Sequence, residues 1–239
     1  MSIDIASRIN SALASITEVC ERVGRRDDIE LELAIKTRSI AECEAAAHAL
    51  RNAQRPIIFG QNRVQEAEVT TPALRELGFS DFRATMIGPL QRNKINKVLR
   101  VVDEIETVDS IRLAEAINQR VAPNRILDVL IQVNTSGEET KSGISPAEAL
   151  EFAQQVARME RMRVTGFMTI GAHTPDEAVV RDSFARLRDI RDAAVSLPGL
   201  EDASTLSMGM SGDYPLAIAE GATRIRLGST IFGPRASSA

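Results

Sequence analysis

The sequence predicts an α/β fold in which eight parallel strands alternate with helices and close into a single (β/α)8 (TIM) barrel. Short apolar runs alternate with stretches whose apolar residues recur every three or four positions, as parallel strands with crossover helices do. The 239 residues are close to the roughly 250 that eight such repeats occupy. No linker or low-complexity tract divides the chain, so we expect residues 1–239 to form one domain. The alternative is a doubly wound sheet, but no Gly-rich dinucleotide turn follows the first apolar run.

A helix precedes the first strand. Apolar residues recur at steps of three and four from Ile5 to Val23, which marks one buried stripe of a helix within the first 23 residues. Ser2 is the expected N-cap, and Gly24 is the expected residue after the helix end. The polar face mixes acidic and basic residues, so we expect this helix to pack against the core and not to bind a membrane.

Eight strands and seven further helices are expected after it. The expected strands are Leu31–Lys36, Pro56–Phe59, Phe82–Gly88, Glu104–Val108, Leu127–Val133, Val164–Met168, Thr205–Met208 and Arg224–Leu227. The expected helices are Ala41–Asn52, Arg63–Leu77, Gln91–Val101, Ile111–Arg120, Pro146–Met159, Pro175–Leu197 and Asp213–Gly221.

Composition excludes several classes of protein. A net charge of −4 without clustered positive charge argues against nucleic-acid binding. No apolar run approaches the roughly 18 residues of a membrane span. Two cysteines and no apolar leader predict a cytoplasmic protein. Neither His48 nor His173 belongs to a ligand-spaced cluster, so we expect no metal site. We also expect a monomer, because the apolar stripes are accounted for by core faces.

Lys36 ends the first apolar strand, where a barrel carries its working face. Desolvation and neighbouring cations at the barrel mouth would favour the free amine that Schiff-base chemistry requires. The alternative is a lysine that buries its stem and extends its amine into solvent.

The loops after the seventh and eighth strands predict a phosphate site. Leu206 to Asp213 is a glycine-containing loop that leads into a helix, and Gly228-Ser229-Thr230 follows the last strand. Barrels often bind phosphate with these two loops, through backbone N–H groups and hydroxyls such as those of Ser211 and Ser229. Ordinary turn chemistry is the alternative for the same residues.

Two further residues are expected near the mouth. Asn62 follows the second strand, either as the N-cap of the next helix or as a ligand contact. Arg226 lies two residues before Gly228, so alternation turns it toward the barrel interior if Gly228 lines the mouth. A buried arginine needs an acceptor, which would be either a carboxylate or the ring nitrogen of a ligand.

An amine on the first strand and a phosphate cradle on the last two resemble a pyridoxal phosphate site. Over nearly its whole length the chain resembles the pyridoxal phosphate homeostasis proteins, whose fold is the barrel of the alanine racemase N-terminal domain. The matching stretches are 34–37, 59–66, 87–94, 131–143, 166–170, 206–211 and 220–233.

The resemblance implies roles for individual residues. Lys36 would form the Schiff base with pyridoxal 5′-phosphate, Arg226 would face the pyridine nitrogen, and Asn62 would line the pocket. Ser211, Gly228 and Ser229 match the phosphate-binding positions. Gln61 and Arg63 stand where the family usually has Glu and Tyr, and Ala84-Thr85 where a Trp-His pair is common; we expect these departures to touch the pocket rim.

The resemblance implies a carrier that functions in vitamin B6 homeostasis, with enzymes that lack the cofactor as recipients. An arginine on the ring nitrogen keeps that nitrogen unprotonated, which makes the ring a weaker electron sink. Alanine racemases take a catalytic tyrosine from a second domain, which this sequence is expected to lack; its one tyrosine, Tyr214, lies on the phosphate side. The alternatives are a small racemase-like enzyme with Lys36 as its base, and an aldolase that uses Lys36 on a sugar phosphate.

Overall fold

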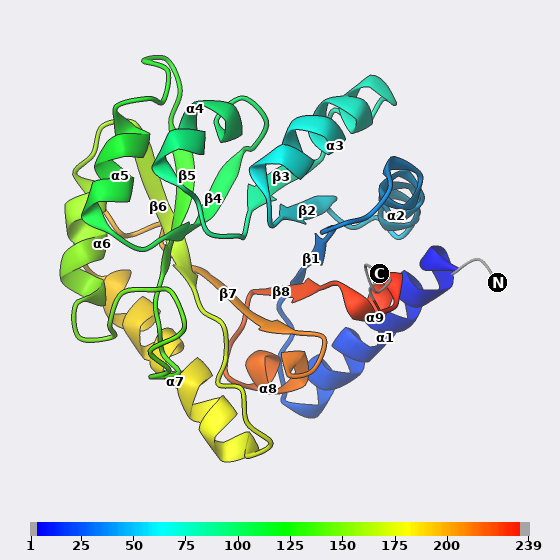
Figure 1. Cartoon of the computed structure of the whole chain (residues 1–239). Coiled ribbons are helices and arrows are strands. Elements are labelled where there is room, and N and C mark those ends of the chain that lie inside the picture. Colours follow the sequence, from blue (N-terminus) through cyan, green and yellow to red (C-terminus); the bar gives the residue numbers. More distant parts are fainter. Residues whose placement is uncertain (1–3, 235–239) are drawn as a thin grey trace.

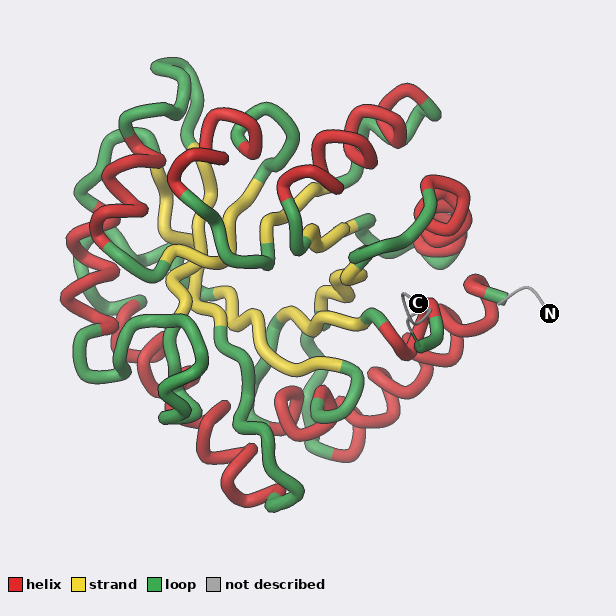
Figure 2. The backbone as a smooth tube through the Cα atoms, in the orientation of Figure 1, coloured by secondary structure: helices red, strands yellow, loops and turns green. Residues whose placement is uncertain are grey.

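The computed structural model describes residues 4–234 and shows eight parallel strands that form a ring inside a layer of helices (Figure 1, Figure 2). Each strand pairs with its neighbours in sequence, and β1 (Glu30–Ala34) pairs with β8 (Arg224–Leu227) to close the barrel. The predicted (β/α)8 architecture and the N-terminal helix are confirmed.

The remaining elements follow the predicted order. The other strands are β2 (Ile58–Gln61), β3 (Arg83–Met86), β4 (Glu104–Val108), β5 (Leu127–Gln132), β6 (Met162–Met168) and β7 (Thr205–Met210). The helices are α1 (Ile5–Arg22), α2 (Ile40–Asn52), α3 (Val64–Glu76), α4 (Ile95–Val98), α5 (Ile111–Asn118), α6 (Ala149–Ala157), α7 (Glu177–Ala194), α8 (Tyr214–Ala219) and α9 (Ser229–Phe232), with a 3-10 turn, η1 (Arg92–Lys94), before α4.

The N-terminal helix α1 packs against α2, α8 and α9 and covers the junction where the barrel closes (Figure 1). Its N-cap is Asp4, whose carboxylate accepts a hydrogen bond from the Ser7 amide at 3.0 Å. The expected N-cap was therefore wrong, and Ser2 itself lies outside the described residues. Gly24 follows the helix end with a φ of +73°, as predicted.

Most element boundaries differ from the prediction by one to three residues, and three larger differences have a physical reason. β1 ends at Ala34, so Lys36 lies on the loop and not in the strand, because the chain turns at Thr37, whose φ is +61°. The predicted helix Gln91–Val101 is shortened to η1 and the single turn of α4, a stretch that contains helix-disfavouring asparagines. The short helix α9 was not predicted, since Ser229 to Phe232 includes β-branched and aromatic residues of low helix propensity.

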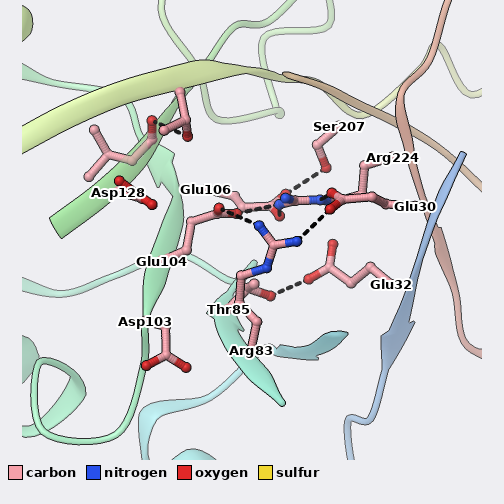
Figure 3. Close-up of polar contacts among 12 residues, drawn as sticks. Glu30, Glu32, Arg83, Thr85, Asp103, Glu104, Glu106, Asp128, Ser207 and Arg224 are labelled. Carbon is pink, nitrogen blue, oxygen red and sulfur yellow. Dashed lines mark hydrogen bonds and ion pairs between the residues drawn. The ribbon is translucent and has the colours of Figure 1, made fainter. Parts of the chain in front are cut away.

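The barrel interior contains a buried ionic cluster where branched aliphatic layers are usual in this fold (Figure 3). We use the term interior ionic cluster for Glu30, Glu32, Arg83, Glu104, Glu106 and Arg224. Arg224 and Glu106 belong to strands on opposite sides of the ring, yet Arg224 Nη1 lies 2.6 Å from Glu106 Oε1. Their contact therefore crosses the interior.

Arg224 is the centre of the cluster. It is 1% exposed, and its guanidinium also binds the Glu104 carboxylate and donates from Nε to Glu30 Oε2 at 2.8 Å. Burial acts to lower the pKa of Arg224, but the surrounding carboxylates, that of Glu106 above all, raise it well above its ordinary value. One buried cation thus joins β1, β4 and β8 electrostatically.

We expect Arg224→Met to lower the free energy of unfolding by about 3–5 kcal/mol, because it leaves buried carboxylates without their partner. Urea unfolding followed by circular dichroism measures this loss. The matched control is Arg163→Met, which removes a more exposed ion pair with Asp128 (N–O distance 2.8 Å) and is expected to cost at most about 1 kcal/mol. Equal losses in the two variants would contradict a central role for Arg224.

Candidate functional site

A pocket of about 280 Å³ opens at the carboxyl ends of the strands. All six residues predicted from the sequence line it: Lys36, Asn62, Ser211, Arg226, Gly228 and Ser229. The other lining residues are Ala34, Arg38, Ile87, Met168, Ile170, Met210, Gly212 and Gly233. The structure thus brings together an amine, a guanidinium, an amide and two hydroxyls from segments far apart in sequence.

The turn beside Lys36 is locally strained. Thr37 adopts a φ of +61°, a conformation that is unfavourable for a β-branched residue. Its amide donates to Glu66 Oε2 at 3.0 Å, so a carboxylate on α3 stabilises this turn. The strained turn directs the chain away from β1 immediately after Lys36 and leaves that lysine half-buried on the pocket wall.

Asn62 is a pocket residue and not a helix cap. Helix α3 begins at Val64 with Arg63 in the N-cap position, and no side chain caps it. The loop that carries Asn62 passes so close to Gly88 that a Cβ there would lie 2.1 Å from the Asn62 carbonyl oxygen. Only glycine allows this approach, which holds Asn62 against the pocket.

The loops after β7 and β8 lie against each other, as the phosphate prediction requires. The Thr230 amide donates to Ser211 Oγ at 3.3 Å, which joins the first loop to the start of α9. Asp213 Oδ1 accepts from the Met210 amide at 2.6 Å and fixes the loop before α8. Hydroxyl groups and backbone amides at such a junction can bind an anion.

Arg38 is a pocket residue that sequence reasoning missed. Its guanidinium donates to the carbonyl oxygens of Phe232 and Gly233 at 3.3 and 3.2 Å and lies 5.4 Å from the centre of the Phe232 ring. The available signal was a second basic residue two positions after Lys36. These contacts bring the end of α9 close to the lysine turn.

Arg226 lies on β8, is 5% exposed and lines the pocket. Its Nη1 donates to Ser207 Oγ at 2.6 Å, and its Nη2 donates to the Thr169 carbonyl oxygen at 2.7 Å. Ser207 Oγ in turn donates to Glu106 Oε2 at 2.6 Å. The acceptors of the guanidinium are therefore a hydroxyl and a carbonyl, and it keeps further N–H groups for a ligand.

The departures from the family pattern do not touch the pocket rim, and that expectation was wrong. Thr85 is buried in the barrel, where its hydroxyl binds Glu32. Arg63 is exposed, and its Nη1 lies 3.5 Å from Glu66 Oε1. Gln61 is buried, with 1% of its surface exposed. None of these three belongs to the pocket lining.

Residues 4–234 show neither a metal-binding cluster nor a helix that could span a membrane. No group of three or more His, Cys, Asp or Glu side chains in this range is arranged to hold a metal ion. None of its helices combines the length and the apolar character that a membrane span requires.

Comparison with known proteins places this chain in a family. Residues 28–236 match the model of the alanine racemase N-terminal domain. The pyridoxal phosphate homeostasis protein of Escherichia coli (strain K12) is 39% identical over 238 residues, which cover 97% of each chain. The protein of the same name from Aquifex aeolicus (strain VF5) is 36% identical over 241 residues, or 95% of this chain and 97% of that one. The chain belongs to the pyridoxal phosphate homeostasis protein family.

Solved structures agree with this assignment. The crystal structure of an unknown protein from Bifidobacterium adolescentis has a TM-score of 0.88 and 42% identity, and the match covers 96% of this chain and 94% of that one. PipY of Synechococcus elongatus, solved with pyridoxal phosphate bound, has a TM-score of 0.79 and 30% identity, covering 96% and 100%. An alanine racemase of Clostridium difficile, at 15% identity and a TM-score of 0.69, shares the fold.

The composition and burial of the interior ionic cluster favour a bound proton. Together with Arg226, the cluster sets four carboxyl groups against three guanidinium groups. Burial raises the pKa of Glu32 well above its ordinary value, and the neighbouring Glu106 carboxylate raises it further. Burial also raises the pKa of Glu104 to about 7. The opposite holds for Glu106, since Arg224 and Arg226 outweigh its burial and lower its pKa. We therefore expect Glu32 to be protonated in the native protein.

We expect Glu32→Gln to flatten the pH dependence of stability. Glu32 binds its proton more tightly in the native state than in the unfolded chain, where the pKa of its carboxyl group is near 4.5. Its contribution is thus fully present below that pH and is lost as the pH rises toward the raised pKa, by up to about 1.4 kcal/mol per pH unit. Urea unfolding at a series of pH values from about 5 to 8 measures this, with the surface variant Glu68→Gln as the control. Parallel profiles for wild type and Glu32→Gln would show that Glu32 is ionised.

Proposed function

We propose that the chain binds pyridoxal 5′-phosphate in this pocket, holds it as a Schiff base on Lys36, and maintains its intracellular supply without robust catalysis of its own. The observation that carries the proposal is the single pocket that joins Lys36 to the Ser211 and Ser229 hydroxyls and to Arg226. The PLP-bound structure of PipY supports it.

The residues present fit the chemistry of this cofactor. Bound pyridoxal phosphate supplies an aldehyde, which condenses with the Lys36 amine and releases water, and an electron-withdrawing ring. Gly228 lines the pocket where β8 ends and carries no side chain, so it leaves space there for a phosphate. Ser211 and Ser229 offer hydroxyls beside that space. Asn62 would provide an amide contact on the pocket wall.

Arg226 would face the pyridine nitrogen. A guanidinium donates hydrogen bonds and does not give up its proton, so it favours an unprotonated ring nitrogen. Such a ring withdraws electrons less strongly and is a poor catalyst of carbanion chemistry. This arrangement favours storage of the cofactor over turnover of amino acids.

The position of the one tyrosine also supports a carrier. Tyr214 Oη lies 2.8 Å from Ser15 Oγ on α1, and Tyr214 is not among the pocket residues. Lys36 therefore has no tyrosine beside it to act as a second acid or base on a substrate carbon. The alternative function is that of a small racemase-like enzyme with Lys36 as its only base.

We further propose that the protein is a cytoplasmic monomer of one domain. It would deliver the cofactor to enzymes that lack it. Both cysteines are free and buried, which suits a reducing compartment. Within residues 4–234, several of the large exposed apolar side chains are far apart in the sequence, such as Val69 on α3 and Val179 on α7, which supports a monomer.

We expect the purified protein loaded with pyridoxal phosphate to be yellow and to yield, after borohydride reduction, a peptide modified at Lys36. The sequence has four lysines, at positions 36, 94, 97 and 141, so mass spectrometry assigns the site without ambiguity. Lys36→Ala should lose both the absorbance band and the adduct. Lys97→Ala, which breaks only a surface ion pair with Glu68, should retain them. An adduct on another lysine, or a colourless protein that reacts with a sugar phosphate, would contradict the proposal.

The carrier and the enzyme are distinguished with the same preparation. The loaded protein is mixed with D- or L-alanine, and the chirality of the amino acid is followed over time. A carrier should show negligible racemisation. Sustained turnover on the order of 1 per second or faster would establish the enzyme.

We expect Ser211→Ala to raise the Kd for pyridoxal phosphate about tenfold, which corresponds to one lost charge-assisted hydrogen bond. The same variant should bind pyridoxal, which lacks the phosphate, with wild-type affinity. Fluorescence titration with the two compounds measures both constants. Equal weakening of both compounds would show that Ser211 does not contact the phosphate.

A further inference from the structure

A chain of hydrogen bonds connects the pocket with the interior ionic cluster. It runs from Arg226 Nη1 to Ser207 Oγ and from Ser207 Oγ to Glu106 Oε2, with 2.6 Å at each step. Glu106 continues it, because its Oε1 accepts from Arg224 Nη1, also at 2.6 Å. Ser207 and Glu106 are fully buried, and Arg226 is the member that lines the pocket.

The direction of every bond in this chain is determined by its end groups. A guanidinium only donates, so Ser207 Oγ must accept from Arg226 and direct its single proton to Glu106. Glu106 accepts that proton as a carboxylate, which Arg224 stabilises from the other side. The buried negative charge thus acts on Arg226 through one hydroxyl group.

We propose that Ser207 and Glu106 are positioning residues that hold the Arg226 guanidinium in the orientation in which its free N–H groups face the ring nitrogen of the cofactor. The proposal rests on the proposed function for the identity of the ligand. Neither residue contacts the pocket itself; both act through Arg226.

The need for two anchors follows from the surroundings of Arg226. The second anchor is the Thr169 carbonyl oxygen, and Thr169 is itself held by a hydrogen bond from its hydroxyl to the Val133 carbonyl oxygen at 2.8 Å. Within the described residues, Glu32 Oε2 is buried and has no hydrogen-bond partner. Glu32 therefore does not hold Arg226, and the bonds to Ser207 and to the Thr169 carbonyl oxygen are the ones that fix this guanidinium. With both anchors in place, the long arginine side chain has one orientation.

The test compares Ser207→Ala and Glu106→Gln with matched controls in the loaded protein. Ser183→Ala removes another buried serine hydroxyl, on α7, which donates to the Val180 carbonyl oxygen. Glu104→Gln alters the same strand and the same partner, Arg224, but Glu104 has no bond to Ser207. Each variant is loaded with pyridoxal phosphate labelled with 15N in its ring, and the chemical shift of that nitrogen is recorded against pH.

We expect Ser207→Ala and Glu106→Gln to move the ring nitrogen resonance toward its protonated position at neutral pH and to raise the Kd about tenfold. Ser183→Ala and Glu104→Gln should leave the resonance unchanged, whatever their effect on stability. In an Arg226→Lys background, Ser207→Ala should have no further effect on the resonance, because its action passes through Arg226. If Glu106→Gln does not fold, Ser207→Ala decides the test alone.

A wild-type resonance in Ser207→Ala, equal shifts in the controls, or additive effects in the double variant would overturn the proposal. A wild type that takes up no pyridoxal phosphate would overturn only the proposed function. The positioning role is then decided in the ligand-free protein, from the side-chain NMR signals of the Arg226 guanidinium. These signals should show faster rotation in Ser207→Ala than in wild type and Ser183→Ala, and equal rotation would refute the role.

Discussion

The salt bridges of Arg224 are the interaction on which the rest of the molecule depends. A closed parallel barrel must fill its interior with side chains from its own strands, and this chain places a guanidinium among the carboxylates of Glu30, Glu104 and Glu106 there. Removing two charges from water is costly, and their attraction compensates only when every polar atom finds a partner. Glu104 and Glu106 belong to β4, across the ring from Arg224, whereas Glu30 belongs to β1, the neighbour of β8. The cluster therefore connects strands across the barrel as well as the two strands that close it.

The same cluster is connected to the pocket through Ser207 and Arg226. Ala34, Ile87 and Met168 are apolar residues of the pocket lining, and Arg226 is a cation that reaches both the pocket and the cluster. Because Arg226 binds Ser207 and a carbonyl oxygen instead of a carboxylate, its charge is not neutralised by direct pairing. A cation in that state, backed by a buried carboxylate one hydroxyl away, can still donate to a ligand. The ionic interior thus supports the fold and orients the pocket.

The strand order, the bounds of β4 and β8 and the six pocket residues could be predicted because each depends on local pattern or on strand ends. The interior ionic cluster was missed, although it has a signal: Glu30 and Glu32, Glu104 and Glu106, and Arg224 and Arg226 alternate with apolar residues on three strands. Alternation shows that these charges share a face but not that the face is inside, since a half-exposed strand has the same pattern. Only closure of the barrel identifies their partners. The Thr37 turn was missed for a related reason, because its support comes from Glu66 on another helix.

A carrier must bind an aldehyde firmly without activating it for catalysis. In this pocket, one set of residues would provide the affinity and another, Arg226, would limit the activation. On the proposed function, affinity comes from the Schiff base on Lys36 and from the phosphate loops, and neither of these contacts the ring nitrogen. Arg226 acts on the ring nitrogen, and a donor that keeps its own proton prevents the protonation that would strengthen carbanion chemistry. A carboxylate at position 226 would accept a hydrogen bond from a protonated ring nitrogen, stabilise that protonated form and so have the opposite effect. The choice of arginine there separates binding from catalysis, and Ser207 and Glu106 are placed to preserve that choice.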